Sequence, residues 1–262
     1  MDTAAAKPYL GHKLPNREPD GNESRPRTRW PGAVETAEER SWTGAPVRVF
    51  EDRHDAGRRL ALVLERFRTE QPVVLAMPRG GVPVAVEVAR ALDAPLDVAV
   101  VRKVGAPRNA EYAIGAVAEG GVRLVGGAAT RALGLSQQQV QALFARAEQD
   151  LTSRVNRYRG TREPIQLEGR TAILVDDGLA TGRSAAAALQ SLRRRGAARL
   201  ILAVPVAARE SLRALAEIAD EVVAVEAPAE LWAVGYWYEQ FAPTTDREVR
   251  EALGYEDPAA SD

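Results

Sequence analysis

The sequence predicts an α/β protein in which helices flank an open parallel sheet. From about residue 50 onward, short apolar runs alternate with segments whose apolar residues recur at helical spacing. Strands that alternate with helices form crossover units, and such units assemble a parallel sheet that is covered on both faces. The chain has 262 residues, of which 45% are hydrophobic and 27% charged, as is typical of a globular protein.

The first half of the pattern predicts two strands and two helices before a polar interruption. One helical face between residues 52 and 70 collects Ala56, Leu60, Val63, Leu64 and Phe67. The pattern then predicts a strand over 73–77, a helix over 82–92, a strand over 96–101 and a polar loop over 103–114.

A hairpin and a long helix come next. Apolar stretches at 113–118 and 122–125 flank Glu119-Gly120-Gly121, a turn sequence typical of hairpins. Ser136 is a favoured N-cap for a helix over 136–159. The alternation then predicts strands over 171–175, 199–204 and 221–225, helices over 183–195 and 209–218, an aromatic segment LWAVGYWYEQF and a helix from about Thr245.

Residues 1–45 differ from the rest of the chain. They are rich in Pro, Gly and charged residues and have no repeating apolar face. Such a segment cannot bury enough surface to offset its ordering entropy. We therefore expect a disordered N-terminal tail over 1–45 and one domain over 46–262.

Composition excludes several classes of function. With no Cys and two His, the chain lacks disulfides, thiolate metal sites, a Cys nucleophile and a His-rich metal site. The net charge of -1 makes no electrostatic case for a nucleic-acid partner, and we do not expect one. No apolar run approaches the roughly 20 residues that span a bilayer. The N-terminus lacks the apolar core of a signal peptide. We expect no membrane contact and a cytoplasmic location.

The residues after the strand at 171–175 form the strongest candidate site. Ligands of open parallel sheets bind beyond the carboxyl ends of the strands. Two adjacent carboxylates, Asp176 and Asp177, can accept hydrogen bonds from vicinal hydroxyls such as those of a ribose. In the small-residue turn that follows, backbone amides and the hydroxyls of Thr181 and Ser184 can hold a phosphate at a helix N-terminus. These features predict a ribose 5-phosphate site; the alternative is a plain strand–turn–helix with Asp as N-cap.

The run ILVDDGLATGRS at 173–184 resembles the phosphoribosyl diphosphate (PRPP) motif of type I phosphoribosyltransferases. Its ATG centre is most similar to adenine and uracil phosphoribosyltransferases, whereas Gly178 replaces the usual apolar residue. The resemblance implies a type I phosphoribosyltransferase-like fold, an open parallel sheet with a small C-terminal hood. It also implies PRPP binding by Asp176, Asp177, Gly178, Leu179, Ala180, Thr181, Gly182 and Ser184.

Two other segments are similar to loops of the same family. Arg79, Gly80 and Gly81 resemble the pyrophosphate loop, which implies that they bind the diphosphate of PRPP. The segment 102–114 resembles the mobile catalytic loop, which implies catalytic roles for Lys103, Arg108 and Glu111. The alternatives are a surface turn and a solvated charged loop.

The segment 226–245 is similar to the hood of hypoxanthine-guanine phosphoribosyltransferases. By position, the resemblance implies that Trp232 stacks on the acceptor and that Glu239 assists the metal. The implied cofactor is Mg²⁺, which Asp176, Asp177 and Glu239 would hold mostly through water or substrate. Ala180 and Pro205 replace the acid and the Lys that oxopurine enzymes use, so hypoxanthine and guanine are not the expected acceptors.

The resemblance implies a PRPP-dependent glycosyltransferase of nucleotide metabolism. Such an enzyme transfers ribose 5-phosphate from PRPP to a nitrogenous, heterocyclic acceptor and releases diphosphate. The expected partners are PRPP and an unidentified acceptor, and a homodimer stays open. An alternative is a non-catalytic PRPP- or nucleotide-binding regulator, and a third is a scaffold that works through its tail. The Arg102-Lys103 pair favours catalysis, because a pure sensor needs no lid.

Overall fold

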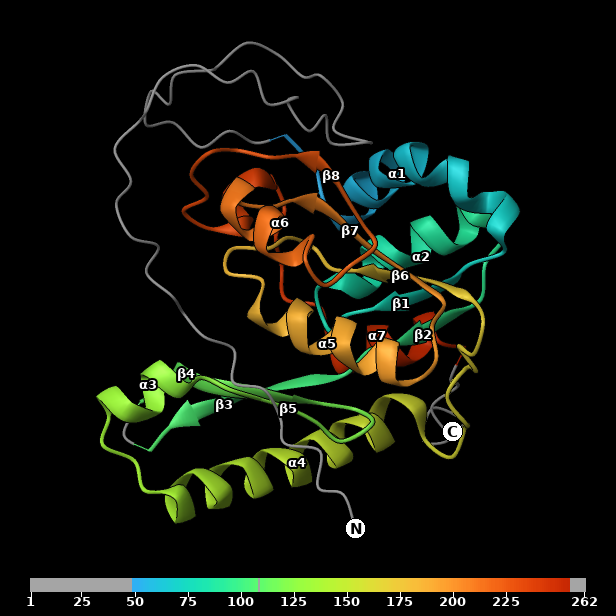
Figure 1. Ribbon diagram of the computed structural model, residues 1–262. Helices are drawn as coiled ribbons and strands as arrows, with labels where there is room; N and C mark the ends of the chain where they lie inside the picture. The colour runs from blue at the N-terminus through green and yellow to red at the C-terminus, as the bar shows by residue number, and fades with distance from the viewer. Residues whose placement is uncertain (1–48, 108, 255–262) are drawn as a thin grey trace, which may run out of the picture.

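Five parallel strands form the central sheet, in the order β2-β1-β6-β7-β8 (Figure 1). The computed structural model describes residues 49–107 and 109–254. The tail expected over 1–45 therefore lies outside the described residues. The strands of this sheet are β1 (Val73–Ala76), β2 (Leu96–Val98), β6 (Thr171–Val175), β7 (Arg199–Val206) and β8 (Glu221–Glu226).

Helices cover both faces of this sheet, as the alternating pattern predicted. One face is packed by α1 (Arg53–Leu64), which continues as the 3-10 helix η1 (Glu65–Glu70), and by α2 (Gly81–Leu92). The other is packed by α5 (Arg183–Arg194) and α6 (Arg209–Leu215).

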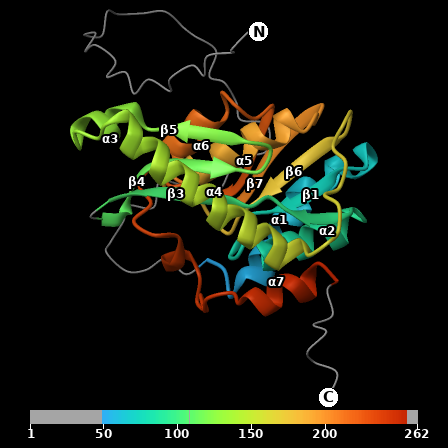
Figure 2. The same cartoon turned by 90° about the horizontal axis from the view of Figure 1, so that it is seen from below.

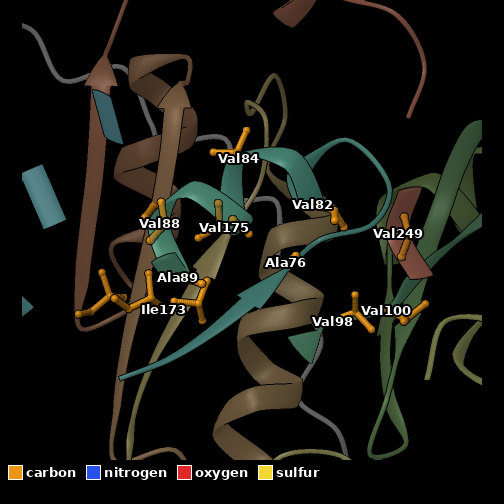
Figure 3. Packing of buried hydrophobic residues seen from close by; sticks show 14 of the residues in the cluster. Ala76, Val82, Val84, Val88, Ala89, Val98, Val100, Ile173, Val175 and Val249 are labelled. Atoms are coloured by element: carbon orange, nitrogen blue, oxygen red, sulfur yellow. The ribbon is translucent and has the colours of Figure 1, made fainter. Parts of the chain in front are cut away.

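Alternate residues of β1 join opposite cores, because successive side chains of a strand point to opposite faces. Val74 and Ala76 belong to the core under α1 and α2, and Val73 and Leu75 belong to the core under α5 and α6. Figure 3 shows the first core, which also includes Val249 of α7 (Asp246–Ala252).

A second, antiparallel sheet of order β3-β4-β5 lies beside the first (Figure 1). Its strands are β3 (Val101–Ala106), β4 (Asn109–Ala118) and β5 (Val122–Val125). It is packed between α5 and the long α4 (Gln137–Arg159), which lies along it in Figure 2. The predicted hairpin at 113–125 is confirmed, and so is the N-cap at Ser136, whose side chain accepts from the backbone N–H of Gln139.

The prediction of a polar loop over 103–114 is wrong, because most of this segment forms paired strands in β3 and β4. Val104 and Ile114 are buried in the core beneath α4, while Lys103 is exposed, so a polar segment still contributes one apolar face. The strand predicted over 96–101 is divided at Ala99–Val100, where the chain leaves the parallel sheet for the antiparallel one. The short helix α3 (Gly127–Ala132) was not predicted.

A buried charged cluster holds the junction between the two sheets. Arg159, only 5% exposed, donates from Nε to Asp97 Oδ1 over 3.1 Å and from Nη1 to Glu119 Oε2 over 2.6 Å. The same carboxylates accept from the backbone N–H groups of Val98 and Val100. These bonds satisfy one backbone N–H on the open edge of β2 and one at the break between β2 and β3.

No helix within residues 49–107 and 109–254 is long and apolar enough to cross a membrane.

Candidate active site

The acidic pair lies at the carboxyl end of β6, in the middle of the parallel sheet. Asp176 Oδ1 accepts the backbone N–H of Asp177 over 2.9 Å. Asp177 Oδ2 accepts from Arg53 Nε over 2.8 Å, and the two side chains are 15% and 10% exposed. Sequence reasoning missed Arg53, because it precedes Asp177 by 124 residues and lies in no motif.

The surroundings of the pair disfavour negative charge. Burial and the adjacent Asp177 carboxylate raise the pKa of Asp176 well above its usual range. Burial also raises the pKa of Asp177, and the Arg53 guanidinium opposes that shift. Removal of a carboxylate from water is unfavourable unless donors or cations replace the water. The pair is therefore suited to a ligand that brings hydroxyl donors or a hydrated cation.

The turn between β1 and α2 approaches the acidic pair closely, which explains Gly80 and Gly81. A Cβ added at Gly80 would overlap Asp177 Oδ2, and one added at Gly81 would lie 2.7 Å from the carbonyl oxygen of Val175. The Pro78–Arg79 peptide bond before these glycines is cis. The two predicted loops, 79–81 and 176–184, are thus adjacent at one sheet edge.

The first residue of the predicted pyrophosphate loop, Arg79, extends in another direction. Its Nη1 lies 3.8 Å from Asp246 Oδ1, at the start of α7. Asp246 also accepts from Arg157 Nη1 over 2.8 Å and from the Tyr158 hydroxyl over 2.9 Å. Arg79 is not among the residues that line the cavity beside the acidic pair.

That cavity, of about 240 Å³, joins the predicted site to the antiparallel sheet. Asp176 and Ser184 line it from the PRPP-like loop, and Lys103 and Arg102 line it from β3. Its other lining residues are Met77, Pro78, Ala99 and Val101. Lys103 therefore faces the site from a strand of a packed sheet rather than from a free loop.

The structure does not describe the side chains of the two other predicted catalytic residues. Arg108 lies outside the described residues, and Glu111 lies on β4 with its side chain outside the described part of the chain. Arg102, which was not in the predicted set, also lies 3.4 Å through Nη2 from Asp150 Oδ2.

The turn from 178 to 184 is hydrogen-bonded to the end of β7 and to α6. Leu179 donates its backbone N–H to the Val206 carbonyl, and the Ser211 hydroxyl donates to the Ala180 carbonyl over 2.6 Å. Gly182, with a φ of 66°, precedes α5 in the left-handed region that glycine favours. Thr181 is exposed and Ser184 half-buried, so both hydroxyls are accessible to a ligand.

Contact with the hood explains why Gly178 departs from the motif. The 3-10 helix η2 (Val234–Trp237) packs Val234 against this glycine, and a Cβ at Gly178 would lie 2.6 Å from Val234 Cγ1. An apolar side chain in the usual position would displace the hood segment. The departure is thus a consequence of close packing.

Residues 237–242 of the hood, which we call the strap, contact the acidic pair. The strap pairs with the chain before α1: Phe50 donates its N–H to the Trp237 carbonyl, and Glu239 and Gln240 donate to the carbonyls of Phe50 and Glu51. The Tyr238 hydroxyl donates to the Asp177 carbonyl over 2.6 Å, and burial raises its pKa. Tyr238 is a second residue that sequence reasoning missed.

Trp232 and Glu239 face solvent in this structure. Trp232 is 69% exposed, Glu239 is also exposed, and neither lines the cavity. Within the described residues there is no group of three or more His, Cys, Asp or Glu side chains that could hold a metal ion. Two carboxylates at the site fit Mg²⁺ only if the substrate and water supply its other ligands, as Mg²⁺ prefers.

The chain is similar to a known protein family and to named proteins of two bacteria. Residues 52–240 match the family model described as "Phosphoribosyl transferase domain". A Mycobacterium tuberculosis (strain H37Rv) protein named "Putative phosphoribosyl transferase" is 45% identical over 203 residues, which is 78% of this chain and 46% of that protein. The chain thus spans about half the length of this relative. The uracil phosphoribosyltransferase of Lactobacillus gasseri is 41% identical over 86 residues, 32% of this chain and 41% of that enzyme.

Among solved structures, the TT1426 protein of Thermus thermophilus is 46% identical. It covers 78% of this chain and 97% of its own, with a TM-score of 0.67. This similarity confirms the predicted open parallel sheet flanked by helices. Because the family model matches residues 52–240, which is more than half of the chain, the chain belongs to the type I phosphoribosyltransferase family.

Proposed function

We propose that the protein transfers ribose 5-phosphate from PRPP to a nitrogenous heterocyclic acceptor and releases diphosphate. The cavity beside β6 carries this proposal, because it brings Asp176 and Ser184 within one space with Lys103 and Pro78. The cavity has a volume of about 240 Å³. In this proposal Asp176 binds the ribose hydroxyls, the turn with Ser184 binds the 5-phosphate, and Lys103 compensates the charge of the diphosphate.

Each part of PRPP has a proposed set of contacts. The 5-phosphate lies in the turn 178–184, where it accepts from backbone amides and from the Thr181 and Ser184 hydroxyls. The ribose hydroxyls donate to Asp176 and Asp177. The diphosphate lies beside Gly80 and Gly81. When bound, Mg²⁺ would neutralise diphosphate charge, and Asp176, Asp177 and Glu239 would hold it mostly through water or substrate.

The protein acts on the reaction mainly through electrostatics. The bond between the anomeric carbon and the diphosphate oxygen breaks with its electron pair leaving on diphosphate. The acceptor nitrogen forms the new bond and gives up its proton to water or to the released diphosphate. Positive charge develops on the ribose in between, and the carboxylates beneath it stabilise that charge. Lys103, assisted by Arg102 on the same strand, stabilises the departing diphosphate. Arg108 and Glu111 stay proposed catalytic residues, with Glu111 on β4 rather than on a loop.

The acceptor is proposed to be an aromatic heterocycle other than hypoxanthine or guanine. Ala180 offers no proton to a base nitrogen, and Pro205 offers no donor to a base oxygen. Trp232 is 69% exposed, and stacking of its ring on a base would contribute roughly 1–3 kcal/mol. Stacking would require the hood to bring Trp232 over the cavity when the acceptor binds.

A screen for diphosphate release tests the proposal. Purified protein is mixed with PRPP and MgCl₂ and offered a panel of nucleobases and amines. The expected result is acceptor-dependent release that Asp177→Asn lowers strongly. PRPP binding by calorimetry without release for any acceptor would identify the protein as a PRPP-binding regulator. Robust turnover of guanine would contradict the acceptor class.

A further inference from the structure

Arg53 connects three parts of the molecule through one side chain. It is the first residue of α1, and its side chain is 10% exposed. Its Nε donates to Asp177 Oδ2 over 2.8 Å, and its Nη1 donates to the carbonyl oxygen of Ala242 over 2.7 Å. The guanidinium carbon also lies 3.8 Å from the centre of the Phe241 ring. Arg53 thus joins α1, the end of β6 and the strap 237–242.

The strap has a second connection to Asp177. The Tyr238 hydroxyl donates to the Asp177 carbonyl oxygen, and the Tyr238 ring packs with Phe50 and Phe241 at centroid distances of 5.3 and 5.0 Å. Arg53 holds the side chain of Asp177 while Tyr238 holds its backbone. Both contacts meet at the residue that the proposed function assigns to the ribose.

The Arg53 bond occupies one oxygen of Asp177. Oδ2 lies between the Arg53 guanidinium and Gly80, where a Cβ would overlap it. An ionised carboxylate accepts through both oxygens, so Asp177 can hold Arg53 and accept from a ribose hydroxyl at the same time. A hydroxyl bonded there restrains the carboxylate, and through it the guanidinium that also holds Ala242.

We propose that Arg53 is a positioning residue that couples ligand binding at the acidic pair to the strap. PRPP bound to Asp177 restrains the guanidinium, and the restrained guanidinium rigidifies the strap. The inference rests on the proposed function, since it requires PRPP at Asp177. It assigns a role to a residue of α1 that lies outside the PRPP-like motif.

A guanidinium is suited to this role for a geometric reason. It presents five N–H donors in a planar fork, so it can hold a carboxylate and a carbonyl at the same time and still lie against an aromatic ring. A Lys ammonium is a point charge that keeps the attraction to Asp177 but cannot match both acceptors and the ring. An Arg53→Lys substitution can therefore keep the positive charge beside Asp177 while it removes the connection to the strap.

Hydrogen exchange of the strap tests the coupling without any acceptor or turnover. The amides of Glu239 and Gln240 donate to Phe50 and Glu51, so their exchange reports on opening of the strap. Exchange of a peptide covering 237–242 is measured with and without saturating PRPP and MgCl₂. The variants are Arg53→Lys, Arg53→Met and, as a control on the same helix, Arg58→Met, whose side chain is 56% exposed.

In the wild type and in Arg58→Met, PRPP should slow strap exchange about tenfold, the factor expected for one charge-assisted hydrogen bond. Arg53→Met should lose this protection at saturating PRPP. Arg53→Lys should bind PRPP with an affinity closer to wild type and also lose the protection. Arg53→Lys decides the matter if Arg53→Met does not fold.

Different results identify which claim fails. If calorimetry shows PRPP binding to the wild type but strap exchange does not respond, or if Arg53→Lys keeps the full protection, the coupling is wrong and the proposed function stands. If the wild type does not bind PRPP with Mg²⁺, the proposed function is wrong and the coupling falls with it.

Discussion

Arg159 Nη1 lies 2.6 Å from Glu119 Oε2, inside the junction between the parallel and the antiparallel sheet. The Arg159 side chain is 6% exposed and that of Glu119 15%. Arg159 also bonds Asp97, so its guanidinium holds two carboxylates that themselves accept backbone N–H groups, and Arg195 adds a second positive charge near both. The arrangement fixes where β3, and with it Lys103, begins.

Arg159→Met should destabilise the protein by about 3–5 kcal/mol, because it removes the guanidinium that is hydrogen-bonded to both carboxylates. Urea unfolding of the protein without ligand measures this. Arg146→Met, an exposed change on the same helix, is the control and should have little effect. Equal stability of the two variants would show that the cluster contributes nothing net.

Gly80→Ala should weaken PRPP binding about tenfold or more while the chain still folds. The new Cβ would displace Asp177 Oδ2, and hydrogen bonds to a charged group contribute roughly 1.5–3 kcal/mol each. Calorimetry with PRPP and MgCl₂ measures the affinity. Gly127→Ala, where an added Cβ comes no closer than 3.2 Å to the end of the Arg131 side chain, is the control. An unchanged affinity for Gly80→Ala would place PRPP elsewhere.

Asp176→Asn should stabilise the ligand-free protein at neutral pH. The folded state raises the pKa of Asp176, so ionisation penalises folding above the usual carboxyl pKa of about 4 and has no effect below it. Melting temperatures from pH 4 to 8 should show an advantage for the variant that grows as the pH rises. A constant difference across this range would rule out titration of Asp176 as its cause. The same variant should bind PRPP weakly.

Lys103→Ala should lower kcat and change KM little. Lys103 lines the cavity opposite Asp176, where its charge is needed most as the diphosphate departs. Steady-state kinetics with an acceptor found by screening measures both constants, and Lys103→Arg should recover part of kcat. A loss that is confined to KM would make Lys103 a substrate-binding residue only.

Local sequence predicted the parts of this protein that depend on neighbours in the chain. The apolar runs at Val73–Ala76 and Thr171–Val175 indicated buried strands, because a strand covered on both faces needs apolar residues at every position. The loop 176–184 indicated a phosphate and ribose site for a similar reason. Its acids, small residues and hydroxyls are consecutive, so the strand and helix around them suffice to place them together.

Tertiary structure decided the contacts between distant residues. The pattern at 103–114 was too polar to predict strands, and its pairing became visible only where Val104 and Ile114 meet the core under α4. Arg53 and Tyr238 lie 124 and 61 residues from Asp177. Residue spacing reports which face of an element is buried, whereas the packing of whole elements determines which distant side chains meet. The sequence thus determined the fold class and the ligand-binding loop, and the packing of α1 and the strap determined what holds that loop in place.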